Sequence, residues 1–243
     1  MMLPLFLLLL QLAVDPFAVV CEGYDAPRPI RIVLAGDSTV TDRSGWGFGF
    51  KGLLADGTVC INLAQRGRSS LSFRSEGWWQ KCLDAKPDFL LIQFGHNHQP
   101  GKGPLRESAA DSEFRDHLRQ FVAEARVAGI KPVLITSLIR RRWNSAGKIV
   151  PTLSEYAEAT TVVARELDVP LLDLHRLSIQ QCEAIGPKAY LAYEPTTKEG
   201  PDHTHLNLVG SEAVAKLVAG ELISLVPALA AYFEQPMKQV SYK

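Results

Sequence analysis

The sequence predicts an α/β domain built on a five-stranded parallel sheet that is covered by helices on both faces. Five short runs are almost continuously hydrophobic, as expected for strands buried on both sides. Amphipathic helical patterns separate these runs, and this alternation is typical of a parallel sheet. The expected strands are Ile30–Ala35, Val59–Leu63, Phe89–Phe94, Val133–Leu138 and Val169–Leu174.

The helical patterns between and after these strands have recognisable ends. Residues Glu113–Ala128 carry apolar side chains at helical spacing, and Gly129 supplies a C-terminal stop. A second pattern covers about Leu153–Leu167. A third covers Leu208–Leu225 and follows Asn207, a residue type that favours helix N-caps. The longest irregular stretches are expected at about Gly95–Asp111, Arg140–Pro151 and Gly186–His205.

Composition indicates one folded domain and excludes some partners. Of 243 residues, 47% are hydrophobic and 21% charged, which is typical of a chain with a sizeable core. We expect this domain to span residues 28–235. The formal net charge is zero, so there is no global electrostatic basis for binding nucleic acid or an anionic membrane surface. The short basic cluster Arg140, Arg141 and Arg142 is expected to be a solvated loop after the fourth strand.

The N-terminal residues resemble a leader. Residues 3–14 form an uncharged, mostly apolar run, which is too short to cross a membrane but has the length of a signal-peptide core. Asp15 and Pro16 end the pattern abruptly, which disfavours a buried core helix. We therefore expect a signal peptide over residues 1–22 and an exported protein, secreted or periplasmic, although no Lys or Arg precedes the run. Lipid anchoring at Cys21 is the minor alternative.

The remaining cysteines are Cys60, Cys82 and Cys182. None has the C-x-x-C spacing of a zinc or redox site. Cys60 lies within an expected strand and is interpreted as a buried apolar side chain. The sequence leaves open a disulfide between any two of the three.

The first candidate for chemistry is the turn that follows the first strand. The strand ends in Gly36, Asp37, Ser38 and Thr39. A small polar turn directly after a buried strand places Ser38 at the carboxyl edge of the sheet, where ligands bind in open α/β folds. A helix expected to begin at about Ser44–Trp46 would favour negative charge near Ser38. By itself, such a segment is more often a simple turn.

Two later loops reach the same edge of the sheet. Gly67 follows the second strand and lets the backbone approach a ligand, so its N–H could donate to an oxyanion. Asn97 follows the third strand and could donate its side-chain amide. Each has a purely structural alternative. Gly67 could be an ordinary turn glycine, and Asn97 could bond its own backbone.

The last candidate segment, Asp202 to His205, precedes the final helix. Asp202 and His205 are three residues apart, which in a turn puts both side chains on one side within hydrogen-bond reach. The carboxylate could orient the imidazole, and His205 could take a proton from Ser38. His203 is the rival base, but it is adjacent to Asp202 and should point elsewhere. A polar loop with an incidental histidine pair is the structural alternative.

Taken together, these segments resemble, in order, the conserved blocks of the SGNH/GDSL hydrolases, and within them the rhamnogalacturonan acetylesterases. The resemblance covers about Ile30 to Leu225 and rests on the residue groups Gly36-Asp37-Ser38-Thr39, Gly67-Arg68-Ser69, Gly95-His96-Asn97 and Asp202-x-x-His205. It implies a three-layer α/β/α, flavodoxin-like SGNH fold that needs no metal or organic cofactor. One departure is His98, where such relatives commonly have Asp. The departure leaves the substrate preference open.

The resemblance also implies the roles of the individual residues. Ser38 would be the nucleophile, with Asp202 and His205 completing a catalytic triad. The Ser38 N–H, the Gly67 N–H and the Asn97 side chain would form the oxyanion hole. We therefore expect a serine esterase that removes acetyl groups from an acetylated polysaccharide or oligosaccharide, with rhamnogalacturonan (pectin) as the first candidate, through an acyl-enzyme.

Several aromatic side chains could stack on sugar rings, although core packing is the expected role of most of them. At least one of Trp78 and Trp79 should lie partly exposed, because adjacent positions on one helix face different directions. The eight candidates are Trp46, Phe48, Phe50, Phe73, Trp78, Trp79, Tyr190 and Tyr193.

Other function classes stay open at this point. A metal-dependent hydrolase could draw its ligands from His96, His98, Asp202, His203 and His205. A lipase or acyl-thioesterase of the same serine family would be expected to carry an apolar lid or acyl groove. A third alternative is a non-catalytic carbohydrate-binding module, which would have no need of Ser38, Asp202 and His205.

Overall fold

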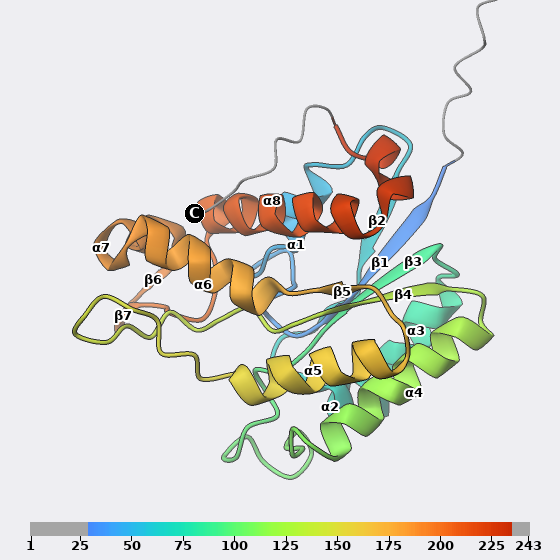
Figure 1. Cartoon of the computed structure of the whole chain (residues 1–243), viewed down its shortest axis with the longest axis horizontal. Coiled ribbons are helices and arrows are strands. Elements are labelled where there is room, and N and C mark those ends of the chain that lie inside the picture. Colours follow the sequence, from blue (N-terminus) through green and yellow to red (C-terminus); the bar gives the residue numbers. More distant parts are fainter. Residues whose placement is uncertain (1–28, 235–243) are drawn as a thin grey trace, which may run out of the picture.

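The computed structural model describes residues 29–234 and has an α/β/α architecture (Figure 1). The expected signal peptide and Cys21 lie outside the described residues. The strands are β1 (Arg31–Gly36), β2 (Val59–Asn62), β3 (Phe89–Gln93), β4 (Lys131–Ile135), β5 (Leu171–Leu172), β6 (Thr196–Thr197) and β7 (Gly200–Pro201). The α-helices are α1 (Gly47–Lys51), α2 (Ser70–Ser75), α3 (Trp78–Asp84), α4 (Glu113–Val127), α5 (Ser154–Glu166), α6 (Leu174–Ile185), α7 (Pro187–Tyr190) and α8 (Leu208–Leu225). Short 3₁₀ helices cover Leu191–Tyr193 and Pro227–Tyr232.

The main sheet confirms the predicted fold class. Its five strands are all parallel and run in the order β2-β1-β3-β4-β5. This is the flavodoxin-like order, in which the winding direction reverses between β1 and β3. The loops that leave these two strands therefore diverge to opposite faces and open a crevice at the carboxyl edge. Ser38 and Asn97 follow these two strands.

Alternate residues of each central strand enter two separate cores. On β1, Ile32 and Leu34 pack with side chains of α1 and α8, whereas Val33 and Ala35 pack with side chains of α2 to α5. Figure 1 shows these two helical layers on either side of the sheet. Each fully buried aliphatic side chain of this size contributes about 1.5–3 kcal/mol to folding. The rigid sheet that results holds the loops at its carboxyl edge.

Three helices begin and end within a residue or two of their predicted bounds. They are α4, α5 and α8. Gly129 follows α4 with φ at +73°, the left-handed conformation that glycine adopts without strain. The side chain of Asn207 accepts a hydrogen bond from the backbone N–H of Gly210 at 2.9 Å, so the predicted N-cap of α8 is confirmed.

Three segments differ from expectation. The fourth strand was expected over Val133–Leu138, but β4 covers Lys131–Ile135. The fifth strand was expected over Val169–Leu174, but β5 has two residues because Asp173 instead caps α6, accepting from Arg176 N at 3.2 Å. Residues 186–205 were expected to be irregular. They contain α7, a 3₁₀ helix and the antiparallel β6–β7 hairpin. Tyr190 in this segment is 1% exposed, so the segment has a small core of its own.

The three cysteines within the described residues are free thiols. Cys82 and Cys182 are buried, and burial raises the pKa of each thiol to about 12. Cys60 was expected to be buried but is only partly so, because β2 is the edge strand of the sheet. In residues 29–234, no helix combines the length and hydropathy that a membrane span requires.

Candidate active site

The turn after β1 is held by side-chain hydrogen bonds on both sides of Ser38. Asp37 is fully buried, and its Oδ1 accepts from the N–H and the hydroxyl of Thr39 at 2.9 and 2.7 Å. The Ser38 carbonyl accepts from the hydroxyls of Thr41 and Ser44 at 2.8 and 3.0 Å. Ser38 is therefore fixed at the carboxyl edge, as predicted.

A buried amide ties this turn to the neighbouring strand. Gln93, the last residue of β3, donates to the Thr39 hydroxyl at 2.8 Å and accepts from the Trp46 indole at 2.8 Å. The helix expected near Trp46 begins at Gly47 and has only five residues. The turn is thus positioned by side-chain contacts with β3 more than by a long helix.

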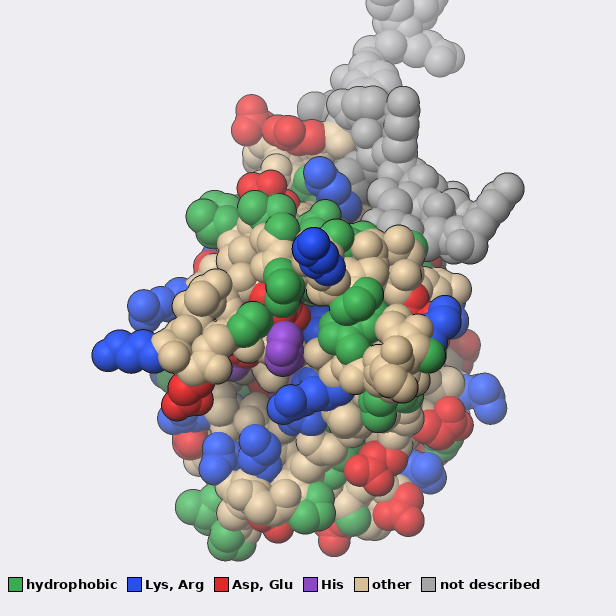
Figure 2. Space-filling model, turned by 90° about the vertical axis from the view of Figure 1, so that its left-hand side faces the viewer, with side chains coloured by type: hydrophobic (Ala, Val, Ile, Leu, Met, Phe, Trp, Pro, Cys, Tyr) green, Lys and Arg blue, Asp and Glu red, His purple; other side chains and the backbone are tan. Residues whose placement is uncertain are grey.

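Ser38, His205 and Asp202 form one hydrogen-bonded chain. The Ser38 Oγ lies 2.9 Å from Nε2 of His205, and Nδ1 of His205 lies 2.7 Å from Oδ2 of Asp202. Ser38 and His205 are 167 residues apart in sequence. Figure 2 views the face that carries α7 and the β6–β7 hairpin, and shows a histidine in a hollow near its centre. A hydroxyl, an imidazole and a carboxylate in this order can activate a serine nucleophile.

Asp202 is fixed by its own backbone turn. Its Oδ1 accepts from the N–H groups of Thr204 and His205 at 2.9 and 3.1 Å, which leaves Oδ2 for the imidazole. Partial burial opposes ionisation, but the hydrogen bonds from His205 and from the two backbone groups outweigh it and lower the pKa of Asp202. The carboxylate is therefore ionised at neutral pH and can stabilise an imidazolium.

The loops after β2 and β3 bring hydrogen-bond donors toward Ser38. Gly67 adopts φ at +73°, which a residue with a side chain tolerates poorly. The Asn97 amide donates one hydrogen to the Arg68 carbonyl at 3.1 Å, so it bonds the adjacent loop rather than its own backbone. Its second amide hydrogen stays available. Among the described residues, the N–H groups of Ser38 and Gly67 donate to no protein acceptor.

Comparison with known proteins adds to this geometry. Residues 34–213 match the model of the GDSL-like lipase/acylhydrolase family. The chain belongs to this family. It is 38% identical over 210 residues to rhamnogalacturonan acetylesterase RhgT of Bacillus subtilis (strain 168), an alignment that covers 79% of this chain and 89% of that protein. It is 34% identical over 196 residues to YesY of the same strain, named a probable rhamnogalacturonan acetylesterase, covering 77% and 90%.

Solved structures show the same fold. Protein YXIM from Bacillus subtilis superposes with a TM-score of 0.71 at 24% identity, over 85% of this chain and 59% of that chain. The acetylxylan esterase Axe2 from Geobacillus stearothermophilus superposes with a TM-score of 0.62 at 15% identity, over 81% and 95%. The family membership and the acetylesterase relatives make this protein a carboxylic ester hydrolase.

In this GDSL hydrolase, His98 belongs to a buried network beside the loop that carries Gly67. Its Nε2 lies 3.0 Å from the backbone N of Ser70 and 2.9 Å from the Ser70 hydroxyl, which in turn lies 2.9 Å from Nδ1 of His117. The ring packs against Phe114 at 4.6 Å between centroids. Burial lowers the pKa of His98 to about 3, so the ring is neutral and its Nε2 accepts. His98 thus holds the first residue of α2, Ser70, in place.

The five candidate metal ligands are not brought together. The ring of His96 is buried beneath the site, with Nδ1 at 3.5 Å from Oδ2 of Asp37. His203 points away from Ser38 as predicted, and its Nδ1 lies 2.8 Å from Glu194 Oε2. His98 lies in the separate network with Ser70. Across residues 29–234, no group of three or more His, Cys, Asp or Glu side chains is arranged to hold a metal ion.

The basic cluster after β4 corrects a prediction. It was expected to be a solvated loop, but Arg141 is 1% exposed, Arg140 is half-buried and only Arg142 is exposed. Burial is possible because Glu194 lies 2.9 Å from Arg141 Nε and is itself buried. Nothing in the local sequence indicates this partner, because Glu194 lies 53 residues further along the chain in a segment expected to be irregular.

Arg141 also holds the loop that carries the histidine and the carboxylate of the site. Its two terminal nitrogens donate to the backbone carbonyls of Thr204 at 2.9 Å, Asp202 at 3.2 Å and His205. The backbone N–H of Arg141 donates to the His203 carbonyl at 2.8 Å. Arg141 therefore binds all four carbonyls of residues 202–205, three through its guanidinium and one through its backbone N–H.

Most of the candidate aromatic residues are core residues, as expected. Buried members are Trp46, Phe50, Phe73, Trp79 and Tyr190, whereas Phe48, Trp78 and Tyr193 are exposed or half-exposed. Trp79 is 2% exposed and its neighbour Trp78 is half-exposed, which confirms that only one of the pair faces inward.

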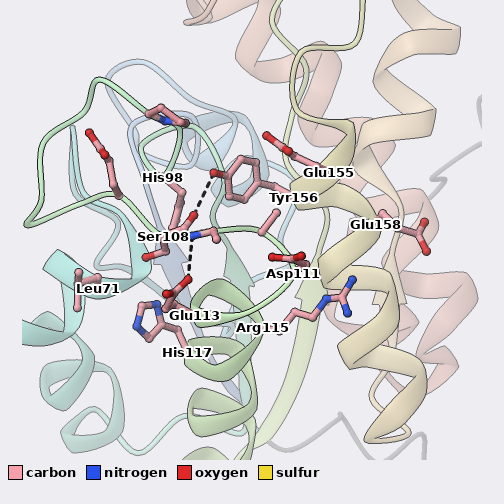
Figure 3. A pocket seen from close by; sticks show the side chains of 14 residues that line it. Leu71, His98, Ser108, Asp111, Glu113, Arg115, His117, Glu155, Tyr156 and Glu158 are labelled. Atoms are coloured by element: carbon pink, nitrogen blue, oxygen red, sulfur yellow. Dashed lines mark hydrogen bonds between the residues drawn. The ribbon is translucent and has the colours of Figure 1, made fainter.

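A large cavity lies away from Ser38. It measures about 860 Å³ and lies between the loop after His98 and the first turns of α4 and α5 (Figure 3). Neither Ser38, Asp202 nor His205 lines it. Its acidic side chains are Glu107, Asp111, Glu113, Glu155 and Glu158. This concentration of carboxylates disfavours a polyanionic ligand there.

Proposed function

We propose that this hydrolase removes acetyl groups from an acetylated polysaccharide, with rhamnogalacturonan as the first candidate, through a serine acyl-enzyme. The observation that carries the proposal is the continuous chain from Ser38 Oγ through His205 to Asp202, at 2.9 and 2.7 Å. The polysaccharide is supported by two relatives that span most of the chain and are named for rhamnogalacturonan acetyl esters.

In the first half of the reaction, Ser38 Oγ attacks the acetyl carbonyl while His205 Nε2 takes its proton. Asp202 keeps the imidazole in the tautomer with Nδ1 protonated and stabilises the cation that forms. The imidazolium then donates its proton to the sugar oxygen, which leaves as an alcohol. The acetyl group remains on Ser38.

In the second half, water replaces the sugar. His205 takes a proton from the water, the resulting hydroxide attacks the acetyl-enzyme carbonyl, and acetate leaves as Ser38 recovers its proton. In both halves the oxyanion accepts from the Ser38 and Gly67 N–H groups and from the second amide hydrogen of Asn97. Each such donor lowers the barrier by roughly 3 kcal/mol.

The test is acetate release from acetylated rhamnogalacturonan by the wild type and by Ser38→Ala. Removing the nucleophile of a triad lowers kcat by about 10⁴–10⁶-fold. Ser224→Ala is the matched control, because Ser224 is an exposed serine near the end of α8 whose hydroxyl donates to the carbonyl of Gly220 at 3.1 Å, within the same helix. The control should retain full activity.

A series of p-nitrophenyl esters of increasing chain length, tested in parallel, separates the alternatives. A preference for acetyl over octanoyl esters supports the acetylesterase, whereas the reverse preference favours a lipase or acyl-thioesterase. Cleavage of p-nitrophenyl acetate without acetate release from the polymer would retain the mechanism and reject the polymer. Full activity of Ser38→Ala would reject the mechanism.

We also propose that the protein is exported. The apolar run at residues 3–14 has the length of a signal-peptide core. Expression with and without residues 1–22, followed by fractionation, tests this. The activity should leave the cytoplasm only with the leader, and activity held in the membrane fraction and lost on Cys21→Ala would indicate a lipid anchor instead.

A further inference from the structure

A small pocket lies against the two loops that surround Ser38. It has a volume of about 330 Å³ and is lined by Thr41, Asp42, Arg43, Asn62, Ala64, Gln65, Arg66 and Arg68. Thr41 donates to the Ser38 carbonyl at 2.8 Å, and the Arg68 carbonyl accepts from the Asn97 amide at 3.1 Å. One wall of the pocket is therefore formed by the turn that comes after Ser38 in sequence, and the other by residues on both sides of Gly67.

The polar groups of this pocket divide into paired and unpaired ones. Asp42 is occupied, because its two oxygens accept from Lys51 at 2.6 Å and from Asn62 at 2.7 Å. Arg68 is occupied by Glu76 at 2.8 Å. The carboxylates near the pocket are thus already bound by other side chains.

Arg43 and Arg66 have no such partner. Both are exposed, and neither side chain makes a hydrogen bond or ion pair within the described residues. On the other side of Gly67, Arg106 donates to the Gly67 carbonyl at 3.4 Å and also lacks a carboxylate partner among residues 29–234. In a chain of zero net charge, three guanidinium groups without a carboxylate partner among the described residues thus line this pocket or contact Gly67. Figure 2 shows Lys and Arg side chains next to the central hollow of this face.

We propose that this pocket is a binding subsite for the carboxylate of a uronic acid residue, which Arg43 and Arg66 recognise. The planar guanidinium matches a carboxylate with two parallel hydrogen bonds, an arrangement that a neutral sugar cannot reproduce. The inference rests on the proposed function, because rhamnogalacturonan contains galacturonate residues and each of them carries one carboxylate. The acid-lined cavity of Figure 3 has the opposite charge, so the two sites would select different ligands.

The subsite would set which esters are cleaved rather than how they are cleaved. A carboxylate held by Arg43 and Arg66 fixes one galacturonate of the same polymer chain whose acetyl group meets Ser38. Because each arginine is exposed, one ion pair alone is worth little in water. Two guanidinium groups in one pocket should together change affinity by about 10-fold.

The first measurement is inhibition of p-nitrophenyl acetate hydrolysis by unacetylated galacturonate oligomers. The wild type should show competitive inhibition, and Arg43→Gln/Arg66→Gln should raise the inhibition constant about 10-fold. Methyl esterification removes the charge of the oligomer carboxylates. The esterified oligomers should therefore inhibit the wild type only as weakly as the unesterified oligomers inhibit the double variant. Arg165→Gln is the matched control, because Arg165 is an exposed arginine in the last turn of α5, and it should keep the wild-type constant.

This assay separates the subsite from the proposed function. If the wild type releases no acetate from rhamnogalacturonan yet shows charge-dependent inhibition, the polymer assignment fails and the subsite stands. If acetate is released but methyl esterification of the uronates changes neither inhibition nor kcat/KM, the subsite is overturned. Equal inhibition of the wild type and the double variant would overturn it as well.

Discussion

Replacing Arg141 by methionine tests how much the buried guanidinium contributes to stability and to the geometry of the site. Arg141 and Glu194 have side chains 0% and 1% exposed, at 2.9 Å from each other. Removing one partner of a buried ion pair leaves an uncompensated charge and costs about 3–5 kcal/mol. We expect the free energy of unfolding of Arg141→Met, measured by urea denaturation, to fall by about this amount.

The double variant Arg141→Met/Glu194→Gln removes both charges. Because no buried charge then lacks a partner, its loss of stability should be smaller than the sum of the two single losses by at least about 1–2 kcal/mol. Arg142→Met is the matched control. Its side chain is exposed and makes no hydrogen bond within the described part of the chain, so it should change stability by less than about 0.5 kcal/mol.

The same substitution should also lower activity in protein that is still folded. Arg141 holds three carbonyls of the loop that carries Asp202 and His205. A displacement of that loop by about 1 Å is worth roughly 100-fold in rate. We expect the loss in kcat, with KM for p-nitrophenyl acetate little changed, at a temperature where circular dichroism shows native structure. An unchanged urea midpoint for Arg141→Met would refute the reasoning. A stability loss of the double variant Arg141→Met/Glu194→Gln that equals the sum of the two single losses would refute it as well.

Three other predictions follow from individual residues. Asn97→Ala should lower kcat by about 10²–10³-fold at unchanged fold, and a loss below about threefold would remove Asn97 from the oxyanion hole. Because burial lowers the folded pKa of His98 to about 3, against about 6.5 when unfolded, its contribution to stability is complete above pH 6.5. That contribution should be lost by about 1.4 kcal/mol per pH unit as the pH falls toward 3. The free energy of unfolding, measured by urea denaturation at several pH values, should fall less steeply with pH for His98→Gln than for the wild type, and an identical pH dependence would contradict the assignment. Cys82 and Cys182, with thiol pKa values near 12, should resist iodoacetamide at pH 8 until urea unfolds the chain, as read by mass spectrometry, and rapid native labelling would contradict their burial.

The fold class could be predicted because its signals are local. Buried strands such as β3 are continuous apolar runs, and helices such as α4 and α8 carry their own periodicity and end signals. The burial of β2 and the extent of β5 were predicted less well, because both depend on neighbours. The edge strand β2 lacks a strand on one side and is only partly buried, and Asp173 begins α6 instead of extending β5.

The candidate site could be predicted in part for the same reason. Ser38 and Asn97 follow strands that must end at one edge, and Asp202 and His205 are close in sequence. The partners of Arg141 and His98 could not be predicted. Glu194 and Ser70 lie 53 and 28 residues away, and nothing in their local sequence indicates those contacts.

The sequence by itself determined the layered α/β class, the order of the candidate catalytic segments and the side chains that could perform ester hydrolysis, because periodicity and spacing act over a few residues. Only the tertiary structure decided which of those side chains meet. It joined Ser38 to His205, separated His96 and His203 from them, and buried Arg141 with Glu194. Burial, charge pairing and hydrogen-bond reach depend on distances between segments far apart in the chain, and folding alone sets those distances.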